Sequence, residues 1–150
     1  MSESSNWLVH DHQRYDKALS ECEEIAEEGL WQDAIEAYER FVDEFKLHIR
    51  MEDEVCFPQF EKYYGDPKGE LAYLAAEHDN IARMMHDLAY VIQRKDYEHF
   101  LASLKPLHKA IKEHNANEET LFLSIKDDQM LMNRAEIMSH LNALKDTVDS

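Results

Sequence analysis

Two stretches of the sequence place a histidine and a glutamate four residues apart inside otherwise apolar helical patterns. HIRMEDEVC begins with His48 and contains Glu52, and HNANEETLF begins with His114 and contains Glu118. Residues four apart lie on one face of an α-helix, about 6 Å from each other, so each pair points into the same space. Imidazole and carboxylate groups are common protein ligands of divalent metal ions.

Two further histidines extend this pattern to both halves of the chain. His12 precedes His48 by 36 residues, and His78 precedes His114 by the same interval. A shift of 66 residues therefore superposes the first half on the second and carries the two glutamates onto each other. The chain reads as two copies of a helical hairpin, and the same shift pairs Asp11 with Glu77, Leu19 with Met85, Phe45 with Ile111 and Val55 with Leu121.

Six ionisable groups in one core layer require a compensating charge. A single core histidine is ordinarily explained by a hydrogen bond, but a buried carboxylate without a partner is expensive. Divalent metal would supply the charge, and two bridging carboxylates suit a pair of ions. Two such ions carry more positive charge than two glutamates neutralise, which predicts a bridging hydroxide or another anion. The predicted metal ligands are His12, His48, Glu52, His78, His114 and Glu118.

Other polar residues near these positions are expected to have different roles. Glu44 is predicted at a solvated edge, whereas Tyr15 and Cys56 are predicted to pack in the core. The remaining histidines are expected outside the metal site: His10 on the wrong helix face, His108 at the edge of an apolar stripe, and His86, His99 and His140 off the stripes.

Four amphipathic segments must position the six residues. Apolar residues recur at steps of three and four, which places them on one stripe of a helix. These stripes run from Leu8 to Ala26, from Trp31 to Val55, from Leu71 to Ile92 and from Leu104 to Ile125.

Breaks between the segments are marked by turn residues. Gly29 separates the first two segments, YGDPKG separates the second and third, and RKDYE separates the last two, with Asp96 as the predicted N-cap. Pro58 is expected to kink or end the second helix, and Pro106 to kink the fourth near its start.

Short connections make consecutive helices antiparallel neighbours. The predicted fold is therefore all-α, an up-down-up-down four-helix bundle with a short extra C-terminal helix. We expect a single domain over residues 1–150, with the bundle at about 7–125 and the C-terminal helix at about 133–148. That last helix would carry the apolar residues Ile137, Leu141, Leu144 and Val148.

The amino-acid composition indicates which classes of binding partner and which cellular compartment to expect for this protein. A formal charge of −16 makes nucleic acid and anionic membranes poor partners, although most of such an excess is simply a solvated acidic surface. No apolar run is long enough to cross a membrane, and MSESSNW lacks the features of a signal peptide. Two cysteines are too few for a disulfide framework and suit a reducing compartment, so we expect a cytoplasmic protein.

Four motifs in order resemble the hemerythrin-like (HHE cation-binding) domains: DH at 11–12, HIRMEDEVCFP at 48–58, EH at 77–78 and HNANEETLF at 114–122. The resemblance implies a hemerythrin-like bundle with a non-haem di-iron centre. It also implies that the six predicted residues are the iron ligands, and that Glu52 and Glu118 bridge two irons together with an oxo or hydroxo group. The residue types alone leave iron, manganese and zinc open.

One position departs from the oxygen-carrying members of that family. They have a further histidine one turn after the third-helix ligand, where this chain has Ala82. The departure leaves an open position at one iron, or requires a substitute ligand such as Tyr15 or Glu44.

The resemblance also implies a class of ligand. It implies binding of O₂ or a related small molecule, such as NO or peroxide, for sensing, storage or scavenging. The alternatives are a di-iron enzyme that dismutates peroxide or reduces NO, and an iron-handling or iron-sensing protein that acts through a protein partner or as a homo-oligomer. No separate catalytic residue is predicted.

Overall fold

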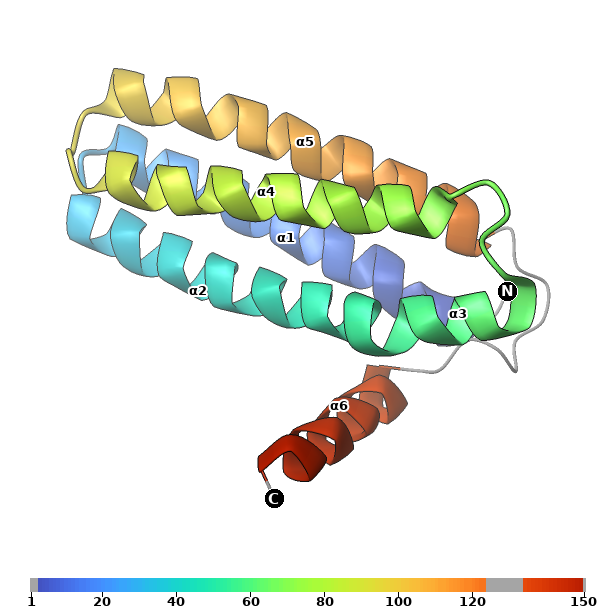
Figure 1. The fold of residues 1–150 in the computed structure, drawn as a ribbon. Helices are drawn as coiled ribbons and strands as arrows, with labels where there is room; N and C mark the ends of the chain where they lie inside the picture. The colour runs from blue at the N-terminus through green and yellow to red at the C-terminus, as the bar shows by residue number, and fades with distance from the viewer. Residues whose placement is uncertain (1–2, 124–133, 150) are drawn as a thin grey trace.

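The computed structural model describes residues 3–123 and 134–149, and every regular element in these ranges is a helix. Four long helices run antiparallel to their neighbours in an up-down-up-down bundle (Figure 1), which confirms the predicted all-α fold. They are α1 (Glu3–Glu27), α2 (Trp31–Met51), α4 (Glu70–Ile92) and α5 (Tyr97–Leu123). None of the described helices is long and apolar enough to cross a membrane.

The predicted turn residues end and begin these helices. Gly29 follows α1 with a φ of 80°, a left-handed conformation that favours glycine. Asp66 accepts hydrogen bonds from the backbone N–H groups of Leu71 and Ala72 and so caps the start of α4. Asp96 accepts one from the N–H of His99 at 3.3 Å, which confirms it as the N-cap of α5.

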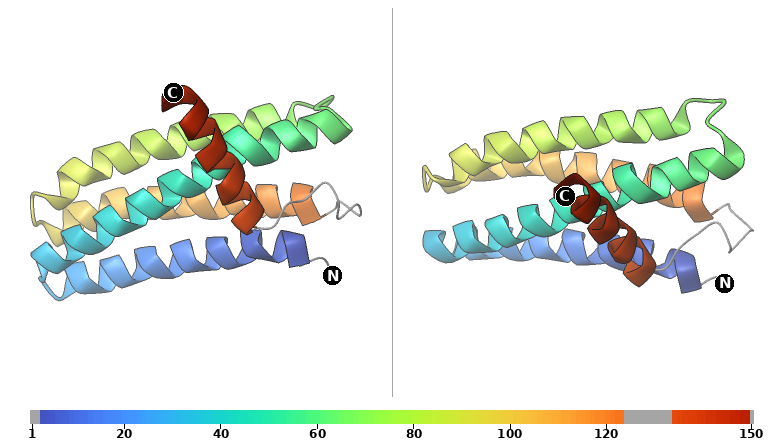
Figure 2. Two further views of the ribbon diagram at one scale, coloured as in Figure 1. Left: turned by 90° about the horizontal axis from the view of Figure 1, so that it is seen from below. Right: turned by 60° about the horizontal axis from the view of Figure 1, so that its bottom comes forward.

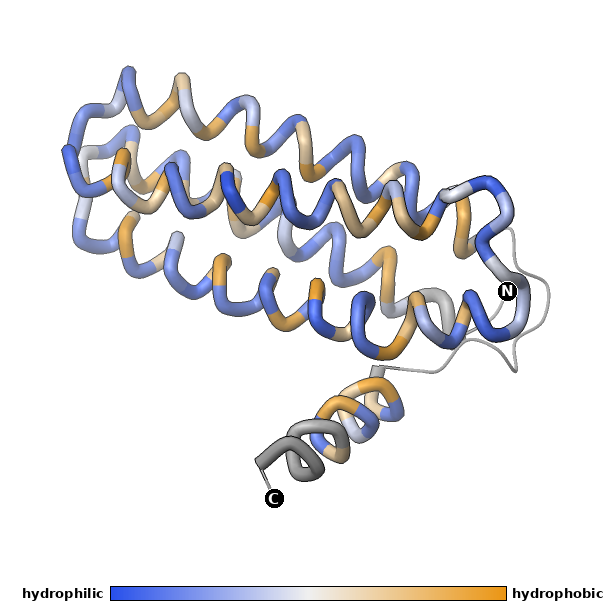
Figure 3. Tube along the Cα trace, viewed as in Figure 1, coloured by the Kyte–Doolittle hydropathy of each residue, from blue (hydrophilic) through white to orange (hydrophobic). Residues whose placement is uncertain are grey.

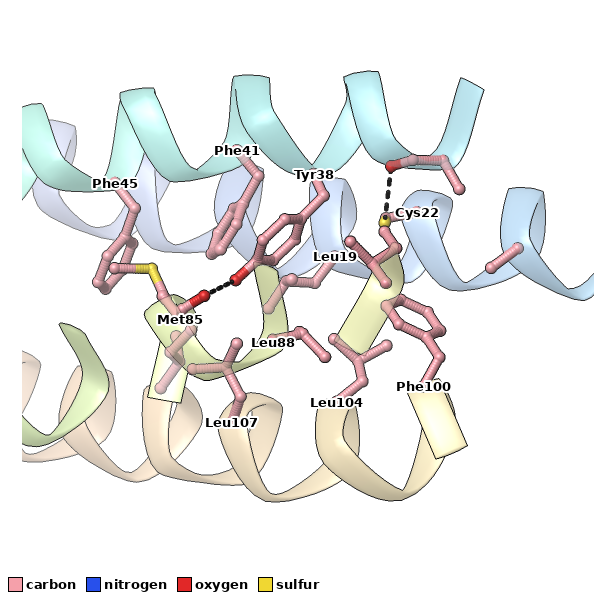
Figure 4. Packing of buried hydrophobic residues seen from close by; sticks show 14 of the residues in the cluster. Leu19, Cys22, Tyr38, Phe41, Phe45, Met85, Leu88, Phe100, Leu104 and Leu107 are labelled. Atoms are coloured by element: carbon pink, nitrogen blue, oxygen red, sulfur yellow. Dashed lines mark hydrogen bonds between the residues drawn. The ribbon is translucent and has the colours of Figure 1, made fainter. Parts of the chain in front are cut away.

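An apolar core fills the bundle from the α1–α2 connection to the middle of the helices. It contains Tyr15, Phe45, Ile81 and Ile111 at its inner limit. Its polar groups find partners within the core. The Tyr38 hydroxyl donates to the backbone carbonyl of Met85 at 2.6 Å, and the Cys22 thiol donates to that of Ala34 (Figure 4). Burial raises the pKa of Cys22 to about 12, so this thiol stays neutral.

A second apolar cluster closes the opposite end of the bundle. It consists of Leu8, Phe57, Phe60, Leu71, Leu74 and Phe122. The predicted metal ligands lie between these two clusters along every helix, because each stripe of apolar residues is interrupted only there. Polar and apolar residues alternate along the helices as this arrangement requires (Figure 3).

The second helix of the first hairpin changes geometry at the site. A π-helical segment, η1 (Glu52–Cys56), follows α2 and leads into α3 (Phe57–Tyr64). Proline has no N–H and its ring crowds the carbonyl four residues earlier, so Pro58 favours a widened turn just before it. The chain remains helical to Tyr64 despite this proline. Pro106 likewise lies inside α5, which continues to Leu123.

The predicted C-terminal helix, α6 (Arg134–Asp149), lies across the outside of the bundle against α2 and η1 (Figures 1 and 2). Its Ile137 and Leu141 are buried against Met51 and Val55. Trp7, Leu47, Cys56 and Met138 border this contact. The side chains of Leu144 and Val148, and the predicted bundle residue Ile125, lie outside the described residues.

Candidate metal centre

The structure brings all six predicted ligands into one buried layer. They come from every helix of the bundle: α1, α2, η1, α4 and α5. Each of the six side chains is more than nine-tenths buried, and His48, His114 and Glu118 have no exposed surface. The six residues are His12, His48, Glu52, His78, His114 and Glu118.

The two histidines of the first hairpin direct their Nε2 atoms toward the two glutamates. His12 Nε2 lies 3.0 Å from Glu118 Oε1. His48 Nε2 lies 3.0 Å from Glu52 Oε1 and 3.6 Å from Glu118 Oε1. Each hairpin therefore contributes histidines that meet a carboxylate of the other.

The second hairpin has the same arrangement. His78 Nε2 lies 3.1 Å from Glu52 Oε1, and His114 Nε2 lies 3.0 Å from Glu118 Oε2. The two Nε2 atoms themselves are 3.0 Å apart. Phe57 stacks on the His78 ring at 5.5 Å and covers the centre on the side of the second apolar cluster.

These contacts divide the donors into two groups that share both glutamates. One group is His12, His48, Glu52 and Glu118, and the other is His78, His114, Glu52 and Glu118. Within each group the four candidate donor atoms lie within 4.8 Å of one another. Two imidazoles and two carboxylates facing a common point suit a divalent metal ion, and a carboxylate has two oxygens with which to serve both groups.

Unsatisfied polar atoms provide a test of this fit. Six buried side-chain atoms of the described residues have no hydrogen-bond partner. Three are His48 Nε2, Glu52 Oε2 and Glu118 Oε2, and the others are His12 Nδ1, His48 Nδ1 and Asn115 Oδ1. Such atoms are rare and costly in protein interiors. The first three belong to the two donor groups, so a bound cation would satisfy them, while His12 Nδ1 and His48 Nδ1 lie within 3.5 Å of the Glu119 and Asp11 carboxylates. The donor set fits a divalent metal.

A second set of carboxylates lies behind the four histidines, at their Nδ1 atoms. Asp53 Oδ1 is 2.9 Å from His78 Nδ1, and Glu77 Oε1 is 3.0 Å from His114 Nδ1. The corresponding distances are 3.5 Å from Asp11 to His48 and 3.3 Å from Glu119 to His12. A carboxylate at Nδ1 fixes the orientation of the ring and leaves Nε2 free for a metal.

Sequence reasoning did not assign a role to these four outer carboxylates. The signal was nevertheless present, because the shift of 66 residues that carries Asp11 onto Glu77 also carries Asp53 onto Glu119. Asp53 and Glu119 directly follow the two shared glutamates along the chain. The duplication therefore includes the residues that orient the histidines as well as the candidate ligands.

Electrostatics at the centre is dominated by the carboxylates. Burial alone would lower the pKa values of His48, His78 and His114, but neighbouring carboxylates raise all three, that of His78 to about 11. Burial would raise the pKa of Glu118, yet hydrogen bonds with Glu52 and the imidazoles hold it well below its usual range.

Neither the Ala82 position nor the two substitute ligands suggested for it, Tyr15 and Glu44, contribute a side chain to the buried layer. Ala82 is exposed and lines a surface hollow between α2 and α4, so its position lies outside the buried layer. The Tyr15 hydroxyl donates to the backbone carbonyl of Glu44 at 3.4 Å. The Glu44 side chain is about half exposed and lies 3.8 Å from Arg14. Cys56 packs among apolar residues of the two clusters beside α6 and α3.

The histidines that were predicted to lie outside the site do so. His10, His86, His99 and His140 are exposed. His108 is partly buried on the outside of α5, where its Nε2 hydrogen-bonds to Asp16 of α1.

The model of the hemerythrin HHE cation-binding domain matches residues 4–125 of the chain. The chain belongs to the hemerythrin HHE cation-binding family. This confirms the resemblance drawn from the four motifs, and the matched range contains all six residues of the buried layer. No curated protein and no solved structure matches the chain. Membership of the hemerythrin family and the two His/Glu groups together indicate a metal-binding protein.

Proposed function

We propose that this protein holds two iron ions and binds O₂ or a related small molecule, NO or peroxide, for sensing, storage or scavenging. His12 and His48 would hold one ion, and His78 and His114 the other. Glu52 and Glu118 would bridge the pair. The observation that carries the proposal is that both glutamates belong to both donor groups, which is the arrangement that a carboxylate-bridged pair requires.

The surroundings of the layer suit a small ligand. Each group offers four protein donors, fewer than the six of octahedral coordination, so positions remain for an exogenous ligand. Bound iron would supply these positions and the electrons for redox chemistry. Phe45 and Ile81 on one side and Phe57 on the other exclude bulk water from the layer. The four outer carboxylates hold the imidazoles in place when a ligand binds or leaves.

The same proposal places the protein in a reducing compartment, the cytoplasm. Both cysteines are free thiols, and Cys22 is buried where it cannot reach another cysteine of the described chain. A reducing environment also keeps iron in the ferrous form that binds diatomic ligands.

Metal content and the ultraviolet-visible spectrum of the purified protein test the proposal together. We expect about two irons per chain, since there are two donor groups, and near-ultraviolet bands that change reversibly between anaerobic reduction and exposure to air. Irreversible oxidation at the same iron content would favour an enzyme over a reversible binder. Failure to hold any metal after anaerobic reconstitution with ferrous iron would refute the proposal.

A further inference from the structure

The shift of 66 residues relates two faces of the bundle, one between α1 and α2 and one between α4 and α5. The α1–α2 face is closed over the centre. Arg14 lies across it, 3.2 Å from Asp11 and 3.8 Å from Glu44. Next to this contact, α6 packs on Met51 and Val55 and lies across α2 and η1 (Figure 2).

The α4–α5 face is open at the equivalent place. A hollow of about 320 Å³ lies there, with Ala76, Glu77 and Ile81 of α4 on one side and Ala110 and Glu113 of α5 on the other. No described helix covers it (Figure 1).

Shorter or more polar residues account for the difference between the faces. The shift that relates them carries Arg14 onto Asn80, Glu44 onto Ala110 and Leu47 onto Glu113. The arginine bridge that closes the first face therefore has no counterpart. Of the residues in the apolar surface beside α6, Leu47 corresponds to the carboxylate Glu113 and Met51 to the amide Asn117, whereas Val55 corresponds to the apolar Leu121.

The hollow reaches the candidate centre through one residue. Glu77 lines it, and Glu77 Oε1 lies 3.0 Å from Nδ1 of His114, whose Nε2 faces the shared Glu118. The Glu77 side chain is 18% exposed, against 5% for its counterpart Asp11. Asp53 and Glu119 are more exposed, at 39% and 28%, but Glu77 lines the α4–α5 hollow and so connects it to a proposed metal ligand.

We infer that metal ions enter and leave the centre through this α4–α5 hollow, with Glu113 at its rim attracting the hydrated cation and Glu77 admitting it past His114. Two carboxylates in a concave surface site favour a divalent cation over an anion. The inference rests on the proposed function, because it presupposes that the buried layer binds metal.

A second hollow provides an internal control. It lies between α2 and α4, has a volume of about 180 Å³ and is lined by Glu39, Ala82 and Met85 among others. Its inner wall is formed by Tyr38 and Met85, which belong to the apolar core, and no proposed ligand or outer carboxylate lines it. Filling it should not affect metal exchange.

The experiment compares Ala110→Leu with Ala82→Leu, and Glu113→Gln with Glu39→Gln. Each pair makes the same change in the α4–α5 hollow and in the control hollow. Anaerobic loading of metal-free protein with ferrous iron, and removal by a chromogenic chelator, would be followed by stopped-flow absorbance. We expect Ala110→Leu to slow both processes about tenfold, which corresponds to an added barrier of about 1.4 kcal/mol. The final iron content should equal that of the wild type.

Glu113→Gln should slow loading by about threefold at low ionic strength, and the effect should vanish in high salt because the charge is then screened. Glu113 is exposed, so this variant remains informative if Ala110→Leu fails to fold. Unchanged rates in both α4–α5 variants, or equal slowing in the control variants, would overturn the route while leaving the metal site intact. A wild-type protein that takes up no iron would instead overturn the proposed function.

Discussion

The two helical hairpins provide the same donors to the centre but differ in what surrounds them. In the first hairpin, the outer carboxylate Asp11 is almost fully buried and paired with Arg14, and α6 packs alongside. In the second, Glu77 accepts a hydrogen bond from the side-chain amide of Asn117 and is partly exposed to a hollow. The comparison shows that the histidines, glutamates and orienting acids are the part of the repeat that stays constant. The covering of the site is the part that has diverged, and it divides the molecule into a closed side and an open side.

The largest expected effect tests whether the hairpins contribute equally to the centre. Glu52→Ala and Glu118→Ala should each lower metal content by about one iron or more per chain, because each removes a carboxylate that both groups share. Metal per chain after reconstitution is the measurement, with Glu54→Ala as the control because Glu54 is exposed only two residues after Glu52. Retention of two ions in both glutamate variants would exclude the shared carboxylates as bridges.

Substitution of an outer carboxylate should weaken metal binding to a different extent on the closed side and on the open side. Asp11→Asn and Glu77→Gln should each weaken metal binding by about 10- to 100-fold. The first change removes the charged partner of the His48 imidazole, and the second removes that of His114. We expect the larger loss for Asp11→Asn, since Asp11 is more deeply buried and Arg14 would lose its ion pair. Affinity would be measured by competition with a chelator, and Asp79→Asn, an exposed change beside His78, is the control. An equal or larger loss for Glu77→Gln would contradict the assigned difference in burial.

The smallest expected effect concerns the contact between α6 and the closed side, and it is an effect on the free energy of unfolding. Leu141→Ala should lower the free energy of unfolding by about 2 kcal/mol, because it truncates a buried leucine between α6 and the bundle. Asn117→Ala, at the position equivalent to Met51 on the open side, should cost less than about 0.5 kcal/mol. Urea denaturation of the two variants and of the exposed control Asn142→Ala would measure this. A Leu141→Ala variant as stable as the control would show that α6 does not stabilise the closed face.

The helices and the six central residues could be read from the sequence because both depend on spacing along one chain. A step of three or four fixes a helix face, and the turn signals at Gly29, at 64–69 and at Asp96 fix where helices begin and end. The repeat then distinguished the four histidines of the buried layer from the others, since His10 and His108 have no histidine at the equivalent position.

The outer carboxylates and the open face could not be assigned in this way, because they depend on how neighbouring helices are rotated against each other. Asp53 reaches His78 across the bundle, and no spacing within one helix records that contact. Similarly, Ala82 follows His78 by one turn yet lies at the surface, because Ile81 takes the inward position on α4. The position of α6 could not be predicted either, because the sequence shows that α6 has an apolar face but not which helices that face packs against.

Up to Val55 the two halves correspond at an interval of 66 residues, but the rings of Phe57 and Phe122, which stack 5.9 Å apart, are separated by 65. A π-helical turn takes up one residue more than an α-helical turn, so the segment Glu52–Cys56 accounts for the difference of one residue between the two intervals. It behaves as a one-residue insertion in the first copy of a duplicated hairpin, absorbed within the helix instead of a loop. Because the extra residue comes after His48 and Glu52, both copies keep their donors in register, while Phe57 takes the place opposite Phe122 that Cys56 would otherwise occupy.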